Sequence, residues 1–243
     1  MILSMSRRED MPKYGVPRVF EALEKYKGQV ECAVLWTKDP APLLKVIDQV
    51  EVPYYFQYTV VYYQSYLHPN LPGIDECIST FKTLVDKVGN RVIWRYDPIV
   101  FTDRIRLQFH LDSFKYIAVA LKGYTDRCVV SLLDNYSYVG SRMKALGVLV
   151  QPPSTSDIDY LCDYMTEICA SSEMEIVTCS EPFLKRILPG KCIDDAYILS
   201  HLGVRVEGAK DPKQRLLCGC VKSVDVGVYG SCKHGCAYCY ATR

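Results

Sequence analysis

The sequence contains no long apolar run and no excess of charge of one sign. No stretch approaches the roughly 18 consecutive apolar residues of a membrane-spanning helix, so we expect no membrane segment. The opening residues, MILSMSRRED, lack the apolar core and the small-residue cleavage site of a signal peptide, which predicts a cytoplasmic protein. The 29 basic and 28 acidic residues give a formal net charge of +1. This balance does not support nucleic-acid binding, although a local basic patch would still permit it.

Internal repeats, low-complexity tracts and convincing linkers are also lacking, which predicts a single domain over residues 1–243 with a cysteine-rich part at 179–243. Short apolar segments, each read as a strand, alternate with helical patterns. The strands are MILSMS, VECAVLW, PYYFQYTV, RVIWRY, RCVVSLL, EMEIVTC and SVDVGVY, and the helices lie near 17–27, 40–49, 73–88, 112–122 and 155–171. This alternation predicts a partial or complete (β/α) barrel of about six to seven parallel strands. A doubly wound open sheet is the alternative.

Polar side chains gather where these strands end. Active sites of barrels are built at the carboxyl ends of the strands, so these side chains are candidates for one site. The residues predicted to bind ligand or to act in catalysis are Arg7, Arg8, Lys38, Arg95 and Asp97, with Ser131 and Asp134 as cofactor-binding residues; Glu9 and Asp10 follow the first strand. Ordinary helix capping is the alternative for Asp39 and Asp97, because each precedes a proline.

Cysteine is the residue type in excess, with 12 in the chain. In a reducing compartment thiols stay free, and clustered cysteines then indicate metal binding rather than disulfides. Cysteine is also a good small core residue. Those that occur within apolar strand or helix patterns are assigned to packing: Cys32, Cys77, Cys128, Cys162 and Cys169.

The segment CKHGCAYC places Cys232, Cys236 and Cys239 at the spacing C-x3-C-x2-C. Three cysteines in one tight loop can bind three irons of a [4Fe–4S] cluster and leave the fourth iron open to a small molecule. Zinc is the alternative, because C-x2-C is also a zinc half-site. Zinc would need a fourth ligand, and His234 lies between the first two cysteines, where simultaneous ligation is sterically awkward. Tyr238 completes C-x3-C-x-Y-C, the signature of radical S-adenosylmethionine (SAM) enzymes, in which an aromatic residue packs beside the cluster.

A second group of cysteines lies outside the apolar patterns, in segments that read as loops. It consists of Cys179, Cys192, Cys218 and Cys220, called here the four-cysteine group. Four cysteines are the usual ligand set of a [4Fe–4S] cluster, so a second cluster is our hypothesis. Structural zinc and free thiols are the alternatives.

The segments SRRED, WTKDP, WRYDPI, QRLLCGC and DVGVYGSCKHGCAYCYA together resemble the bacterial family called domain of unknown function 1848. The cysteine loop alone is also similar to that of the spore photoproduct lyases. The resemblance implies a C-terminal cysteine cluster like that of radical SAM enzymes. We therefore expect a radical SAM enzyme with one [4Fe–4S] cluster, and a second if the four-cysteine group binds one, together with SAM, an unidentified substrate and an electron donor such as ferredoxin or flavodoxin. The cluster loop would follow the last strand instead of the first, which is a permuted barrel order. The alternative is a non-catalytic iron–sulfur or zinc protein that binds nucleic acid or a protein partner.

Overall fold

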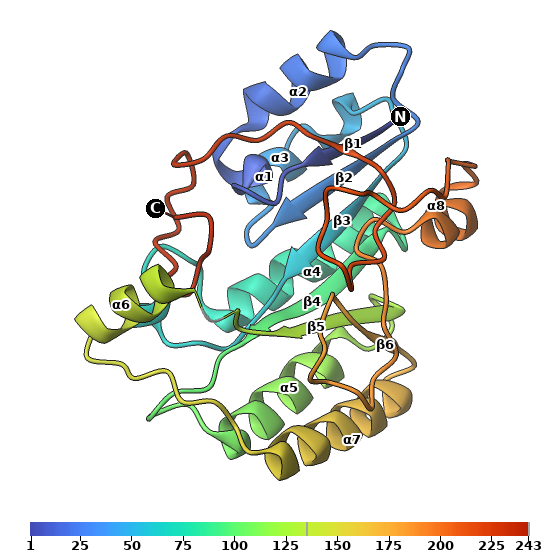
Figure 1. The fold of residues 1–243 in the computed structure, drawn as a ribbon. Coiled ribbons are helices and arrows are strands. Elements are labelled where there is room, and N and C mark those ends of the chain that lie inside the picture. The colour runs from blue at the N-terminus through green and yellow to red at the C-terminus, as the bar shows by residue number, and fades with distance from the viewer. Residues whose placement is uncertain (135, 243) are drawn as a thin grey trace.

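The protein is described by a computed structural model that covers residues 1–134 and 136–242, and its strands form one parallel sheet (Figure 1). The strands are β1 (Ile2–Met5), β2 (Cys32–Thr37), β3 (Tyr54–Thr59), β4 (Val92–Ile99), β5 (Arg127–Leu132), β6 (Glu175–Thr178) and β7 (Val224–Asp225). Their order across the 7-stranded sheet is β6-β5-β4-β3-β2-β1-β7. From β6 to β1, neighbouring strands of the sheet are consecutive in the chain, as in a barrel. Strands β6 and β7 form the two edges of the sheet. The sheet is therefore open, and the predicted partial barrel is confirmed.

Strand β7 pairs with β1, so the last strand of the chain lies beside the first. This is the position that the permuted order requires, because a strand next to β1 continues the cyclic order of a barrel. Only two residues of the segment SVDVGVY pair in the sheet, and they are Val224 and Asp225. The chain then continues at the carboxyl end of β1 into the cysteine loop.

The helices are α1 (Met11–Tyr14), α2 (Val16–Lys25), α3 (Ala41–Leu44), α4 (Ile74–Val88), α5 (Leu107–Leu121), α6 (Ser137–Ala145), α7 (Thr155–Ser171) and α8 (Asp195–Leu202). The helix expected near 40–49 is a single turn, α3, followed by a 3-10 turn at Ile47–Gln49. Helices α6 and α8 were not predicted, although the capping residue Asp194 and the left-handed Gly203 mark the ends of α8. No helix in the described part of the chain is long and apolar enough to cross a membrane.

The two faces of the sheet are covered by different parts of the chain, because successive strand residues point to opposite sides. One face packs against the main helices and holds the larger core, with residues such as Leu3, Leu35, Phe56, Trp94 and Val130. The other face, called here the cavity face, carries Ile2, Val34, Tyr55, Ile93 and Val129. Residues from α8 and the coil around it cover the cavity face, among them Cys192, Ile193, Tyr197, Ile198 and Val221. In Figure 1 this coil, coloured orange to red, crosses the strands.

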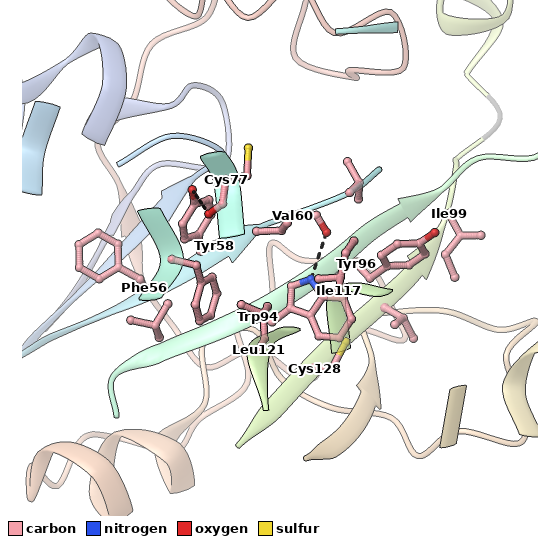
Figure 2. Packing of buried hydrophobic residues seen from close by; sticks show 14 of the residues in the cluster. Phe56, Tyr58, Val60, Cys77, Trp94, Tyr96, Ile99, Ile117, Leu121 and Cys128 are labelled. Atoms are coloured by element: carbon pink, nitrogen blue, oxygen red, sulfur yellow. Dashed lines mark hydrogen bonds between the residues drawn. The ribbon is translucent and has the colours of Figure 1, made fainter. Parts of the chain in front are cut away.

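Aromatic side chains of β3 and β4 fill the centre of the larger core (Figure 2). Trp94 Nε1 donates to the Val60 carbonyl at 3.0 Å, and the Tyr58 hydroxyl donates to the Cys77 carbonyl at 3.2 Å. These bonds satisfy polar atoms that burial would otherwise leave unpaired. The cysteines assigned to packing are all buried, which confirms that prediction: Cys32, Cys77, Cys128, Cys162 and Cys169. Because Trp94 and Tyr96 face the helices, Arg95 between them must face the cavity side.

Candidate functional site

A cavity of about 400 Å³ lies at the carboxyl ends of the strands, on the cavity face. Its volume falls within the range of small-molecule sites. Every residue predicted for the site lines this cavity: Arg7, Arg8, Lys38, Arg95, Asp97, Ser131, Asp134, Tyr238, Cys179, Cys192, Cys218, Cys220, Cys232, Cys236 and Cys239. Candidates from separate strand ends, and from both cysteine groups, therefore share one cavity.

The C-terminal cysteine motif, Cys232, Cys236 and Cys239, forms part of the cavity wall. Its thiols are free; Cys236 is buried, and the other two are partly exposed. Gly235 allows the tight turn before Cys236, because its φ of +69° is in the left-handed region that glycine adopts without strain. A side chain there would also place its Cβ 3.1 Å from Pro69 Cγ. Burial raises the pKa of Cys236 to about 11, so this thiol is protonated while it has no bound metal.

His234, which lies inside the motif, is held by other residues. Its Nε2 is 2.7 Å from Asp10 Oδ2 and its Nδ1 is 3.3 Å from the Tyr14 hydroxyl. Asp10 also accepts from Thr37 Oγ1 at 2.8 Å and from the Lys38 amide at 2.7 Å. Both ring nitrogens of His234 are therefore engaged, and the imidazole links the loop to the ends of β1 and β2.

The predicted strand-end segment SRRED also holds the chain that leads into the motif. The Ser6 hydroxyl donates to Asp225 at 2.5 Å, and Arg8 Nη1 donates to the Gly227 carbonyl at 3.1 Å. Glu9 accepts from the Val228 amide at 2.8 Å. This segment thus fixes the exit of β7, and Arg8 contributes to positioning as well as to the cavity wall.

Two cations on the cavity wall have buried nitrogens without a hydrogen-bond partner among the described residues: Lys38 Nζ and Arg7 Nη2. Lys38 Nζ lies 5.3 Å from the ring centroid of Tyr238, and the Arg7 guanidinium lies 5.0 Å from that of Trp36. Cation–π contacts of this kind offset only part of the lost hydration of a buried cation. An anionic ligand in the cavity would supply the missing acceptors.

Arg95 lies deeper in the cavity and its donors bind protein groups. Nη1 is 3.0 Å from the Cys192 sulfur and 3.2 Å from Gln57 Oε1, while Nη2 donates to Asp97 Oδ2 at 2.6 Å. Ser131 donates to the other carboxylate oxygen of Asp97. Asp97 therefore lies within β4 as the partner of Arg95, and it is no helix cap.

The two remaining acidic residues from the strand ends have different surroundings. Asp39 accepts from the Ala41 amide at 3.1 Å and so lies at the start of α3, although the N-cap position of that helix is Pro40; it also pairs with Lys13 at 2.6 Å. Asp134 pairs with Arg215 at 2.9 Å, and both side chains are about half exposed at the cavity. The Asp134–Arg215 pair therefore joins β5 to the coil that covers the cavity face.

The four-cysteine group is brought together by the fold. The sulfurs of Cys179 and Cys192 lie 2.9 Å apart, and the Ile193 amide donates to the Cys220 sulfur at 3.4 Å. Hydrogen bonds from Cys179 and Cys220, together with Arg95, hold the pKa of Cys192 well below its ordinary value despite its burial. A hydrogen bond from Cys220 likewise lowers the pKa of Cys218 to about 6. The same contacts raise the pKa of Cys179 and of Cys220, so the hydrogen bonds among these thiols favour ionisation of Cys192 and Cys218 over that of their partners.

Sequence reasoning missed several residues of the site, and Gln57, Tyr240 and Arg142 illustrate why. Gln57 faces the cavity within an otherwise apolar strand, and its polarity was a signal that could have been used. The Tyr240 hydroxyl donates to the Arg7 carbonyl at 2.6 Å. Arg142, in α6, donates to the carbonyls of Ala237 at 2.8 Å and Thr242 at 2.7 Å. No sequence pattern marks Arg142, because it binds backbone atoms remote in the chain.

Among residues 1–134 and 136–242, no three His, Cys, Asp or Glu side chains are arranged as ligands of one metal ion. A [4Fe–4S] cluster does not require such convergence, because each thiolate binds a different iron. The family model described as "Domain of unknown function (DUF1848)" matches residues 16–241, nearly the whole chain. No curated protein and no solved structure matches the chain at a significant level.

Proposed function

The chain belongs to the DUF1848 family, and from this premise we propose that it is a radical SAM enzyme acting on a substrate held in the cavity. One observation carries the proposal: the C-terminal cysteine motif and the unpartnered cations Lys38 and Arg7 line the same cavity. The motif provides thiol ligands, and the cations provide donors for a carboxylate. Together they match a cluster that keeps one iron open and a ligand that carries a carboxylate.

The donor set fits a [4Fe–4S] cluster. Cys232, Cys236 and Cys239 would hold it, and His234 would not, because Asp10 and Tyr14 occupy its ring nitrogens. When bound and reduced by a donor such as ferredoxin or flavodoxin, the cluster supplies the electron that cleaves a carbon–sulfur bond of SAM.

The protein's own residues bind and orient the ligands. Lys38 and Arg7 donate to the SAM carboxylate, which gives their buried nitrogens acceptors. Asp97, fixed by Arg95 and Ser131, accepts from a hydroxyl of the ribose or of the substrate. Tyr238, buried beside Cys236, would pack beside a cluster held by the motif and exclude water from it.

Anaerobic reconstitution with iron and sulfide, followed by reduction and addition of SAM, tests the proposal. We expect 5′-deoxyadenosine or methylthioadenosine in the products. A reconstituted protein that binds iron and sulfide but leaves SAM intact would overturn it and favour a non-catalytic iron–sulfur protein. In that case nucleic-acid binding that weakens steeply with salt would identify the partner class.

A further inference from the structure

The four-cysteine group comes from two segments of the chain that meet on the cavity face. Cys179 directly follows β6, and Cys192 precedes α8. Cys218 and Cys220 lie in the coil between α8 and β7. We propose that these cysteines bind a second [4Fe–4S] cluster, separate from the C-terminal motif and on the wall of the same cavity. This proposal does not depend on SAM cleavage.

The thiols already contact each other and are free of disulfides. Cys179 and Cys192 have their sulfurs 2.9 Å apart, and all four cysteines have unbonded thiols. Three of them are buried and Cys179 is partly buried. Four thiols grouped within the protein, with no disulfide joining them, form a complete ligand set for one cluster.

The surroundings of the group are cationic and donate hydrogen bonds to sulfur. Arg95, only 5% exposed, directs Nη1 to the Cys192 sulfur at 3.0 Å. The Ile193 amide donates to the Cys220 sulfur at 3.4 Å. Asp97 already balances part of the Arg95 charge, and Nη1 would donate to the sulfur of a bound cluster, whose thiolate ligands add negative charge beside this buried guanidinium. Hydrogen bonds to the ligand sulfurs are also one of the means by which proteins set the potential of such clusters.

The spacing of the cysteines favours a cluster over structural zinc. Zinc half-sites usually have the spacing C-x2–4-C. Here the pairs are C-x12-C, from Cys179 to Cys192, and C-x-C, from Cys218 to Cys220. Neither pair fits a zinc half-site, and the group lines the cavity instead of a closed structural site.

The coil that carries Cys218 has room to adjust to a bound cluster. Leu216 and Leu217, just before Cys218, are 87% and 55% exposed. The Cys218 amide donates to the Arg215 carbonyl, three residues earlier, at 2.9 Å, which closes a single local turn. This exposed segment therefore lets Cys218 adjust to a cluster without disturbing the sheet, while the sulfurs of Cys179 and Cys192 would have to separate so that each binds its own iron.

The test uses the full chain in which the C-terminal motif is removed by Cys232→Ala, Cys236→Ala and Cys239→Ala together. After anaerobic reconstitution with iron and sulfide, we expect about four irons and four sulfides per chain, with the electron paramagnetic resonance of a reduced [4Fe–4S] cluster. Adding Cys192→Ala, or separately Cys218→Ala, should abolish this iron and signal. Adding Cys162→Ala, a buried packing thiol, should leave both unchanged.

Other outcomes overturn the proposal. The proposal is overturned if the triple variant binds no iron, or if it binds about one zinc per chain in preference to iron. It is also overturned if the four cysteines oxidise to a disulfide that blocks metal binding. Circular dichroism shows whether the triple variant is folded. If it is not, the intact chain is measured instead and should bind about eight irons. An intact chain that binds only about four irons would overturn the second cluster. Because none of these measurements uses SAM, a failure here is distinct from a failure of the radical SAM assignment.

Discussion

The two cysteine regions line one cavity but are held in different ways. The C-terminal motif has thiols that do not bond to one another, and its backbone is fixed by partners far away in the chain. The Ala237 amide donates to the Leu67 carbonyl at 2.8 Å, and Asn70 Nδ2 donates to the Lys233 carbonyl at 2.7 Å. The four-cysteine group has thiols in contact, while the backbone around Cys220 bonds mainly within its own coil and to Ile193, which precedes α8.

On the two proposed assignments, this difference would make the C-terminal site one that is formed before metal binds and the four-cysteine group one that metal completes. In the C-terminal region, neighbouring side chains set the loop and leave the thiols at the cavity wall. In the four-cysteine group the contact between Cys179 and Cys192 connects the covering coil to the end of β6. We therefore expect metal binding to the second group to be coupled more strongly to the order of the chain.

The largest expected effect follows from Cys236→Ala. Removal of this ligand should reduce SAM cleavage to background, because an open-iron cluster cannot be held by the two remaining cysteines. The fold should persist, with the free energy of unfolding lowered by about 1 kcal/mol. Products are quantified by chromatography and stability by denaturant unfolding. Cys162→Ala is the matched control and should cleave SAM normally; cleavage retained by Cys236→Ala would refute the role of the motif.

Hydrogen exchange on metal-loaded and metal-free protein tests how the two regions are held. We expect amides of residues 205–221 to lose protection by roughly tenfold or more when metal is removed, since local opening of this coil is then resisted by few contacts. Residues 225–242 should lose less, because Asn70, Glu9 and Arg142 still hold them. Greater loss in 225–242 would reverse the comparison.

The sheet and most of the cavity wall could be predicted from the sequence. Short apolar strands that alternate with helices lead to a parallel sheet, and the carboxyl ends of parallel strands lie at one edge. That rule alone brings Arg7, Lys38 and Arg95 to one cavity. The covering of the cavity face could not be predicted, because the coil around Cys220 has no regular period and its place depends on tertiary contacts.

The roles of individual side chains were less predictable than their positions. Asp39 and Asp97 both precede a proline, yet Asp39 bonds to the first amide of α3 and Asp97 pairs with Arg95. The difference arises because β4 continues through Asp97 to Ile99, whereas β2 ends at Thr37. Sequence alone does not fix where a strand ends, and so it does not fix which aspartate lies at the start of a helix.

Lys38→Met tests whether the unpartnered cation binds SAM. Methionine keeps the unbranched shape but removes the charge, so we expect SAM affinity to fall by about 10- to 100-fold, which corresponds to the loss of one charged hydrogen bond. Calorimetry on the iron-loaded protein measures the dissociation constant. Lys45→Met, at an exposed position, is the matched control. An unchanged affinity in Lys38→Met would mean that the carboxylate binds elsewhere.

The smallest expected effect concerns Arg142, whose guanidinium donates to the carbonyls of Ala237, Cys239 and Thr242. Arg142→Ala should weaken the last turn by about 1–3 kcal/mol, because several carbonyls lose a charged donor. Exchange of the amides of residues 237–242 should therefore accelerate by roughly tenfold or more, while the iron content stays unchanged. Arg142→Lys should show a smaller change, since an ammonium lacks the planar fork that reaches several acceptors. Equal exchange in all three proteins would mean that packing of Tyr238, and not Arg142, orders the turn.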